Sequence, residues 1–455
     1  HGTQIGNPVL LEFSAANFRS LRAEQSLDLR ATATRELSNV VRRPEGLDAE
    51  TRGVTAVAAV FGANASGKTS LFVAADFMCR AVLLSTAGAV EGSGVLQEVV
   101  PFKFDPQSLV GPTRLRAVFL HGGVRREYGM VLQPGPGAKG FVRVVSEWLR
   151  EWPRGRARDV FLRGEAAAAA GHALPWWVSE EGFHGGRRLA GDLFEQTRDD
   201  VLFLSLASQR NHPQAKLVVN WFHERFHTAF RKSTRQTEES MLADPRVAEY
   251  VSRLMCAADT GIQRVEIRRD EETSSSVQAL RTRLEQAAPE WKLEVDTDAF
   301  TTRMVHRGES GEEVVLPLAE ESNGTQRLFR LAGPIYAALR DGRCLWIDEL
   351  DTGMHHWLLR AIVKMFQNPA TNPNGAQLLF TTHDAALMDS TLFRRDQIWI
   401  VEKDAAQGSQ LYSLVDFEDK PRKSQPLFKA FLSGRFGGVP QLDEAAIMQW
   451  PRGDP

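Results

Sequence analysis

Three patterns in this 455-residue sequence predict an α/β fold. Alternating apolar and polar residues over 9–30 and 113–149 predict antiparallel strands, because the side chains of a strand point to opposite faces in turn. An apolar strand, a glycine-containing loop and a helix follow one another over residues 54–84. In the last third, CLWIDEL, AQLLFTTH and QIWIVEK each predict a buried strand, with helical patterns between them. We therefore expect an antiparallel N-terminal lobe and a C-terminal α/β lobe.

The order of these patterns divides the chain into three predicted segments. Residues 8–149 form the N-terminal lobe, residues 150–300 a mainly helical insertion, and residues 301–455 the C-terminal lobe. Within the insertion, helices are expected over 190–260 and 274–288. No heptad run is long enough for an extended coiled coil, so a long helical arm is not expected.

The composition is typical of a folded protein from a reducing compartment. The chain is 43% hydrophobic and 25% charged, and its net charge of −2 gives no general attraction to nucleic acid. Any DNA contact therefore needs a local basic patch. The three cysteines (Cys79, Cys256 and Cys344) have no CxxC spacing, which argues against a disulfide framework. With no signal peptide or long apolar run apparent, we expect a cytoplasmic protein that does not contact membranes.

The stretch GANASGKT matches the phosphate-loop pattern G-x-x-x-x-G-K-[ST] at every fixed position, between a predicted strand and a predicted helix. Backbone N–H groups of such a loop surround phosphate oxygens, and the helix N-terminus adds its positive dipole end. Lys68 would reach the β- and γ-phosphates, and Thr69 would give a hydroxyl to Mg²⁺. The candidate nucleotide-binding residues here are Gly62, Asn64, Ser66, Gly67, Lys68, Thr69 and Ser70.

Two further strands end in groups suited to phosphate chemistry. CLWIDEL places Asp348 and Glu349 directly after four apolar residues. Asp348 would hold the Mg²⁺ shell, and Glu349 would act as the general base that activates water. AQLLFTTH places His383 at the end of another apolar strand, from which its imidazole could contact the γ-phosphate and the attacking water.

Taken together, the motifs resemble the ABC-type ATPase head of the SMC, RecF and OLD-like branch. GANASGKT, SNGTQ at the start of a helix, LWIDELD and TTHD occur in the order of that family. The similarity covers most of residues 8–149 and 312–402. ANFRSL is similar to the opening of this branch, and SNGTQRL, DELDTGMHH and FLSGRFGGVP resemble stand-alone phage-defence ATPases of the AbiL/RloA type.

The resemblance implies that two heads enclose two ATP molecules. The signature motif of one copy would then cap the nucleotide on the phosphate loop of the other copy. On this basis Ser322, Gly324 and Thr325 would contact ATP bound to a second subunit, and Asp351 would cross the dimer interface. Gln209 would be the glutamine that senses Mg²⁺ and the attacking water. The signature here reads ESNGTQ where the family pattern is LSGGQ.

The implied function is a Mg²⁺-dependent ATPase that dimerises around ATP and acts as the sensor or switch subunit of an antiphage defence system. Its output would be a separate effector chain such as a Toprim or HNH nuclease. The alternative within the same branch is a DNA-repair or DNA-clamp ATPase of the RecF or SMC type. Local basic stretches that could contact DNA, or simply face solvent, contain Arg154, Arg156, Arg158, Arg231, Lys232 and Arg235.

A competing motif, HERFH, satisfies the zinc-hydrolase pattern H-E-x-x-H. On one helix, His223 and His227 would face the same side and Glu224 would be the base. The neighbouring Trp221 and Phe222 favour an ordinary amphipathic helix instead.

Overall fold

The chain folds into two compact units. The computed structural model describes residues 8–34, 36–135, 140–229, 234–258, 260–270, 275, 278–279, 299–417, 426–440 and 443–448. Unit 1 comprises His1–Thr228, Asp341–Leu350 and Ile362–Pro455, and unit 2 comprises Ala229–Arg340 and Asp351–Ala361. The predicted α/β fold class, with an antiparallel N-terminal lobe and a phosphate loop on a parallel sheet, is confirmed.

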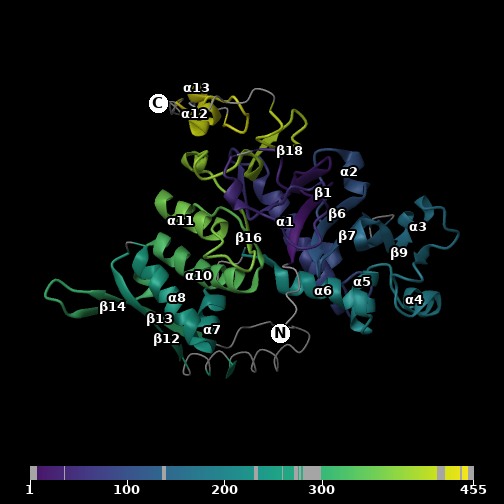
Figure 1. Ribbon diagram of the computed structural model, residues 1–455, viewed down its shortest axis with the longest axis horizontal. Coiled ribbons are helices and arrows are strands. Elements are labelled where there is room, and N and C mark those ends of the chain that lie inside the picture. Colours follow the sequence, from purple (N-terminus) through teal and green to yellow (C-terminus); the bar gives the residue numbers. More distant parts are fainter. Residues whose placement is uncertain are drawn as a thin grey trace, which may run out of the picture. The chain divides into compact units, whose positions relative to one another are not determined.

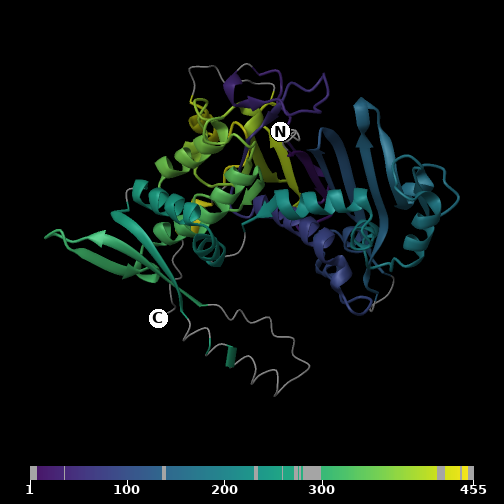
Figure 2. The same cartoon turned by 60° about the horizontal axis from the view of Figure 1, so that its bottom comes forward.

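Unit 1 contains a seven-stranded antiparallel sheet of order β10-β9-β8-β7-β6-β1-β2 (Figures 1 and 2). The predicted alternation is borne out, since buried residues such as Leu115, Ala117 and Phe119 face the core. The strands are β1 (Val9–Ala16), β2 (Gln25–Asp28), β6 (Thr113–His121), β7 (Val124–Pro134), β8 (Val142–Trp152), β9 (Arg158–Gly164) and β10 (Trp176–Val178). Because β9 and β10 belong to this sheet, the antiparallel lobe extends beyond the predicted boundary at residue 149.

A buried carboxylate joins this sheet to the helix α5 (Phe203–Gln209). Glu147 accepts hydrogen bonds from the backbone N–H groups of Phe203 (2.7 Å) and Leu204 (2.9 Å) and from the Tyr128 hydroxyl (3.0 Å). Burial raises the pKa of Glu147, and these donors together with Arg163 oppose that rise. The carboxylate thereby fixes where α5 begins.

The second sheet of unit 1 has the order β11-β15-β16-β5-β17-β18 and carries the phosphate loop. Its strands are parallel except for the antiparallel pair β17–β18. They are β5 (Val57–Phe61), β11 (Phe226–Thr228), β15 (Cys344–Ile347), β16 (Gln377–Thr381), β17 (Ile398–Lys403) and β18 (Ser409–Ser413). All five residues of β5 and all four of β15 are buried, as the continuous apolar runs predict for parallel strands covered on both faces.

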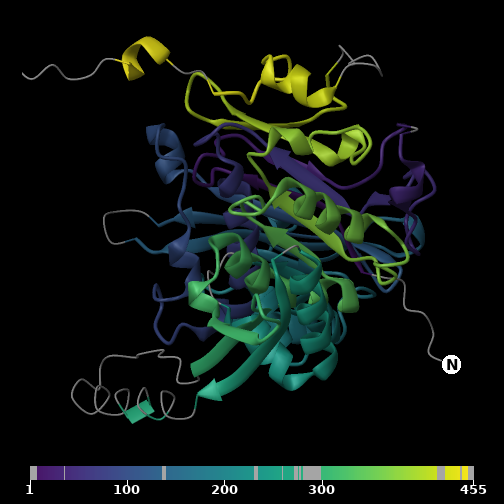
Figure 3. The same ribbon diagram turned by 90° about the vertical axis from the view of Figure 1, so that its left-hand side faces the viewer.

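Several helices surround these sheets or connect their strands. They are α1 (Lys68–Leu84), α2 (Pro106–Val110), α3 (Glu165–Ala169), α4 (Gly186–Glu195), α6 (Pro213–Arg225), α11 (His356–Gln367), α12 (Leu427–Leu432) and α13 (Glu444–Ile447), with a small ribbon β3 (Val41–Arg42) and β4 (Val54–Thr55). Segments far apart in sequence meet here, since Leu411 N–H of β18 donates to Gln25 Oε1 of β2 at 2.6 Å (yellow-green and purple in Figure 3).

One segment in the described part of the chain, Lys68–Ala87, has the length and composition that crossing a membrane requires. It contains α1, and 56% of its apolar window is buried inside the structure. The core helix of a globular protein meets the same criteria, and α1 is such a helix because residues such as Phe72 and Phe77 are fully covered.

Unit 2 is built from helices and a separate three-stranded antiparallel sheet of order β12-β13-β14 (Figure 2). Its elements are α7 (Arg235–Ala243), α8 (Pro245–Ala257), β12 (Ile262–Asp270), β13 (Ala299–Arg307), β14 (Glu313–Pro317) and α10 (Asn323–Asp341). The helix predicted over 274–288 lies largely outside the described residues. The predicted insertion 150–300 therefore corresponds to neither unit, because it contains strands of both.

Candidate nucleotide-binding site

The predicted phosphate-binding groups meet at one edge of the parallel sheet. Gly62 follows β5, Asp348 follows β15 and His383 comes two residues after β16. These three strands are neighbours and parallel, in the order β15-β16-β5, so their carboxyl ends meet at the same edge. Residues separated by more than 280 positions in sequence are thus brought together by strand order alone.

The backbone of the phosphate loop needs glycine at two positions. Gly62 has φ of 155° and Gly67 has φ of 104°, both in a region that L-residues rarely adopt. A methyl group on Gly62 would overlap the Val401 carbonyl oxygen, and one on Gly67 would overlap Ser409 Oγ. The loop is therefore held closely by β17 and β18, and Gly67 leads directly into α1.

The Lys68 ammonium group lies inside the loop. Its Nζ donates to the carbonyl oxygens of Gly62 (2.8 Å) and Ala63 (2.9 Å) and lies 3.4 Å from His383 Nδ1. Lys68 is buried, whereas His383 is exposed. The structure thus brings together two of the residues that the sequence predicted to contact the γ-phosphate.

A hydrogen-bonded network links the predicted Mg²⁺ ligands to the predicted general base. Asp348 accepts from the hydroxyl of Thr69 at 2.9 Å and from that of Thr381 at 2.6 Å. Thr381 Oγ1 in turn accepts from the backbone N–H of Glu349 at 2.7 Å. Glu349 is exposed and has φ of 50°, in the left-handed region that non-glycine residues rarely occupy, and functional sites often hold such residues. Sequence reasoning missed Thr381, although TTHD contains it.

Four serine residues connect the phosphate loop and the start of α1 to distant segments of the chain. The Ser409 hydroxyl donates to Ser66 O at 2.6 Å and lies 2.8 Å from Ser20 Oγ, which donates to Ser70 Oγ at 2.8 Å. The predicted residues Ser66 and Ser70 are therefore buried parts of this cluster, whereas Asn64 is exposed at the tip of the loop. Ser20 lies in the ANFRSL stretch, but no sequence pattern pointed to Ser409.

The predicted signature residues begin α10 in unit 2. Ser322 Oγ caps this helix by accepting from the backbone N–H of Thr325 at 3.1 Å, and the two hydroxyl groups are 2.8 Å apart. Ser322 is exposed, while Thr325 is buried. A methyl group on Gly324 would overlap the Gly353 carbonyl oxygen, so the loop after Asp351 lies directly against the start of α10.

Gln209 does not lie near the phosphate loop, which corrects its assigned role. It ends α5, and its amide donates to Thr86 Oγ1 just beyond the C-terminal end of α1. Because α1 has 17 residues and each adds about 1.5 Å, roughly 25 Å separates Thr86 from the loop at the other end. The LSLASQ stretch instead packs against the sheet through Glu147.

The zinc-hydrolase reading of HERFH is wrong. The helix α6 ends at Arg225, and His227 lies on the strand β11, which pairs with β15. His223 and His227 therefore do not share one helical face as the motif requires. Within the described residues, no group of three or more His, Cys, Asp or Glu side chains is placed to hold a metal ion.

A glycine-rich loop, a buried lysine and a carboxylate bonded to the loop threonine define a P-loop nucleotide-binding site. Residues 181–389 match the family model described as "AAA domain, putative AbiEii toxin, Type IV TA system". The match spans less than half of the chain and includes the start of α10, Asp348 and His383, while the phosphate loop lies before it. The site geometry and this match together support a P-loop ATPase, and residues 181–389 are similar to this family. The narrower assignment to phage-defence ATPases stays a prediction.

Solved structures of SMC heads are similar to this chain at low identity. The SMC head bound to the C-terminal winged-helix domain of ScpA is 13% identical, with 89% of this chain and 97% of that chain covered and a TM-score of 0.40. The SMC head from Thermotoga maritima is 14% identical, with coverages of 89% and 98% and a TM-score of 0.38. The Smc head with an extended coiled coil bound to the C-terminal domain of ScpA, from Pyrococcus furiosus, is 13% identical, with coverages of 94% and 99% and a TM-score of 0.39. Similarity of this degree carries no statement about partners. No curated protein matches the chain.

Proposed function

We propose that this chain hydrolyses ATP with Mg²⁺ and that its active form is a dimer with two shared sites. The observation that carries the proposal is the continuous network from Thr69 through Asp348 and Thr381 to Glu349, beside Lys68. The network brings the Thr69 hydroxyl, the Asp348 carboxylate and the backbone of Glu349 to the sheet edge where the Lys68 ammonium group lies. Hydrolysis of ATP requires all of these groups around the γ-phosphate.

The donor set fits Mg²⁺, which binds hard oxygen ligands such as one hydroxyl and one carboxylate together with phosphate oxygens. Thr69 Oγ1 and Asp348 would hold the ion, which neutralises charge on the phosphate chain when bound. Lys68 would turn its ammonium group from the carbonyl oxygens of Gly62 and Ala63 toward the β- and γ-phosphates. His383, 3.4 Å from Lys68 Nζ, would contact the γ-phosphate from the adjacent strand end.

Glu349 is the proposed general base. Its backbone is held by Thr381 and its side chain is exposed, so the carboxylate can reach a water molecule bound at the sheet edge. The carboxylate would take a proton from this water while the water oxygen attacks the γ-phosphorus. The bond between that phosphorus and the bridging oxygen of ADP would then break. The products are ADP and phosphate.

The second copy is proposed from the start of α10. Ser322 and Asn323 are exposed there, in front of backbone N–H groups at a helix N-terminus. In a head-to-head dimer these groups, with Gly324 and Thr325, would meet the γ-phosphate of ATP bound to the other copy. Asp351 comes two residues before Gly353, whose carbonyl oxygen lies against Gly324.

The proposed biological role is a cytoplasmic, ATP-controlled switch in a bacterial defence system, acting on a separate effector such as a Toprim or HNH nuclease. The family description, which names a toxin of a toxin–antitoxin system, supports this role. A DNA clamp of the RecF or SMC type is the second candidate. It is favoured by Arg154 and Arg156, which are exposed at the turn after β8. Arg158 is paired with Glu151 and contributes less.

The test compares Glu349→Gln with wild type at saturating ATP by light scattering and phosphate release. The variant should bind ATP, lose at least about 100-fold in turnover, because general bases contribute that much, and accumulate as a dimer. The exposed Glu320→Gln is the matched control and should behave as wild type. Adding Ser322→Arg should prevent the dimer. A Glu349→Gln variant that binds ATP and stays wholly monomeric contradicts the two-copy model.

Lys68→Ala tests the phosphate loop separately and should abolish turnover. Normal turnover in this variant would remove the loop from the mechanism. Titration of labelled duplex DNA at several salt concentrations then separates the two roles, since a DNA clamp should bind with a steep salt dependence that Arg154→Ala and Arg156→Ala reduce. Copurification of a nuclease chain without DNA binding would favour the defence role.

A further inference from the structure

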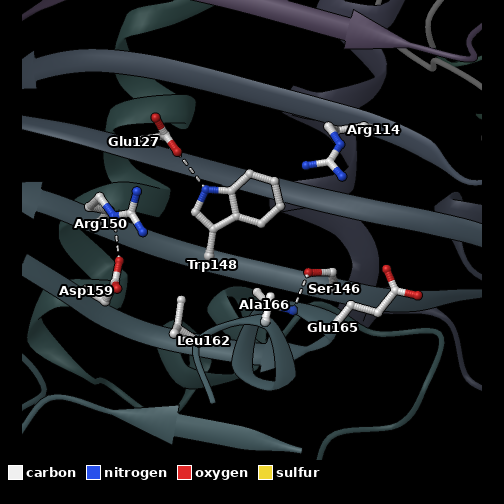
Figure 4. Close-up of a pocket in the computed structure, with 11 residues that line it drawn as sticks. Arg114, Glu127, Ser146, Trp148, Arg150, Asp159, Leu162, Glu165 and Ala166 are labelled. Carbon is white, nitrogen blue, oxygen red and sulfur yellow. Dashed lines mark hydrogen bonds and ion pairs between the residues drawn. The ribbon is translucent and has the colours of Figure 1, made fainter. Parts of the chain in front are cut away.

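A cavity of about 480 Å³ opens on the antiparallel sheet of unit 1, away from the phosphate loop. This volume is within the usual range for small-molecule sites. Strands β6 to β9 and the helix α3 line it, and the Trp148 indole forms its floor (Figure 4). Leu162, Ala166 and Ala169 provide an apolar wall. Neither the sequence motifs nor the proposed ATPase mechanism uses any of these residues.

The indole ring is fixed in one orientation. A methyl group on Gly129 of β7 would overlap the ring atom Cζ2, so the indole lies on the backbone of the neighbouring strand. Its Nε1–H donates to Glu127 Oε1 at 2.8 Å. Val131, Leu162 and Ala167 pack against it. Trp148 is 8% exposed and Arg114 lies over its ring, so a planar ligand would contact only the part of the fixed indole that lines the cavity.

The charged side chains at the two ends of the cavity differ in their pairing. On one side, Arg150 donates to Asp159 at 2.6 Å, and Glu127 is bonded to Trp148 and to Arg116. On the other side, with Ser146, stand Arg114 and Glu165 (Figure 4). Among the described residues, neither of these two side chains makes a hydrogen bond or ion pair. The Arg114 guanidinium carbon lies 5.7 Å from the centroid of the indole ring.

We propose that this cavity binds a guanine base. Two arginines and three carboxylates line the cavity, and Arg116 pairs with one of these carboxylates, Glu127. The summed charge is therefore near neutral, which does not suit a polyphosphate ligand. A planar, uncharged ring suits the Trp148 floor. Guanine presents two acceptors, O6 and N7, on the edge that arginine binds with two hydrogen bonds, and two donors, N1–H and N2–H₂, that a carboxylate accepts. Arg114 would donate to O6 and N7, and the carboxylate of Glu165 would accept from N1–H and N2–H₂.

Adenine lacks this arrangement, since it pairs one acceptor with one donor on the same edge. The same base could come from a free nucleoside or from single-stranded nucleic acid, in which bases stack on aromatic side chains. Guanosine, GMP and a single-stranded oligo-dG probe therefore represent one chemistry from different sources. None of them requires a phosphate site within the cavity.

The test is saturation-transfer NMR and calorimetry on the full chain carrying Lys68→Ala, which removes binding at the phosphate loop. Guanosine should bind at least about tenfold more tightly than adenosine, because a bidentate contact to one base contributes that much discrimination. Arg114→Ala and Glu165→Gln should each weaken guanosine binding by about tenfold. Both residues are exposed, so these variants should fold normally, and Arg143→Ala on the same sheet is the control.

Arg114→Lys should fail to restore affinity, because a lysine cannot form the paired contact. Binding of oligo-dG but not of guanosine or GMP would support the same contact with nucleic acid as the source. Equal affinity for adenosine, preference for free tryptophan over guanosine, guanosine binding unaffected by Arg114→Ala, or no binding of any guanine probe would each overturn the proposal.

Discussion

The starts of two helices, α1 in unit 1 and α10 in unit 2, use similar residues in opposite ways. Both begin with glycine and hydroxyl residues, GKT and SNGT. At α1 the surrounding groups are buried and bonded to distant segments, since Ser20, Ser66 and Ser409 lie behind the loop. At α10 the capping bond comes from Ser322 of the same turn, and Ser322 remains exposed.

Similar residues at a helix start can therefore be either enclosed by distant segments of the chain or left exposed at the surface. At α1, the groups that would bind phosphate and Mg²⁺ come from the same chain, at the carboxyl ends of neighbouring strands. At α10, Glu320 and Glu321 directly precede the capping Ser322, and the ligand of the proposed function would be ATP on a second copy. Each of the two sites contains a glycine that no larger residue can replace without overlap.

Gly67→Ala should have the largest effect. The new methyl group would overlap Ser409 Oγ in a backbone at φ of 104°, which strains the loop and displaces the serine cluster. We expect ATP affinity to fall roughly 100-fold or more, equivalent to about 3 kcal/mol of strain, measured by calorimetry. Gly434→Ala is the control. Gly434 also has a positive φ, but a methyl group there would meet no other atom, so ATP affinity should be unchanged. Normal affinity in Gly67→Ala would mean that the loop is not held as described.

Gly324→Ala should separate the two regions. The methyl group would overlap the Gly353 carbonyl oxygen, moving the loop after Asp351 away from α10. ATP binding to a single chain should be unchanged, whereas turnover and ATP-dependent dimerisation should fall about tenfold or more, in line with about 1.4 kcal/mol lost at the interface. Sedimentation velocity with and without ATP measures this. Gly191→Ala, on α4 with room for the methyl group, should show neither loss. Reduced ATP binding to the monomer would contradict the separation.

Thr381→Val tests the link within the α1 site. Valine keeps the shape of threonine but removes the hydroxyl that donates to Asp348 and accepts from Glu349 N–H. We expect kcat to fall about tenfold while ATP affinity changes little. The backbone N–H of Glu349 would lose its acceptor, and such a loss costs about 1–3 kcal/mol and would displace the proposed base. Steady-state kinetics across Mg²⁺ concentrations should also show a weaker Mg²⁺ response. The buried Thr55→Val, remote from the site, is the control. Loss of affinity without loss of kcat would assign Thr381 to nucleotide binding instead.

Ser409→Ala should have the smallest effect. It removes one hydrogen bond to the Ser66 carbonyl oxygen and the contact with Ser20, while the backbone N–H of Ser409 still donates to Ser20 O at 2.7 Å. Loss of about 1 kcal/mol corresponds to roughly fivefold weaker ATP binding. Ser413→Ala on the same strand should be neutral, because the Ser413 hydroxyl makes only long bonds of 3.5 Å, to Arg395 O and from Val415 N–H. An equal change in both variants would indicate a general loosening of β18.

The strands and the phosphate-loop residues could be predicted because their signals are local. Apolar runs such as CLWI and the fixed spacing of GANASGKT depend only on neighbouring residues. The structure brings Lys68, Thr69, Asp348 and His383 together as predicted. Gln209 could not be placed correctly, since its position depends on α5 packing through the buried Glu147, which no local pattern reveals.

Contacts between distant segments were also beyond sequence reasoning. Ser409 enters the site because β18 pairs antiparallel with β17, beside the β5 strand that carries the loop. HERFH failed for the same reason, since pairing of Phe226 with Cys344 turns the end of α6 into a strand. Pairing between strands far apart in sequence overrides the local preference in both cases.

The position of β5 in its sheet has a consequence for biosynthesis on the ribosome. Both neighbours of this strand, β16 and β17, are translated more than 300 residues after it. The nascent chain must therefore keep an apolar strand and a glycine-rich loop unpaired until most of the polypeptide has emerged. The strands that flank β5 pair with it only after this delay, so the phosphate loop reaches its final geometry late in folding.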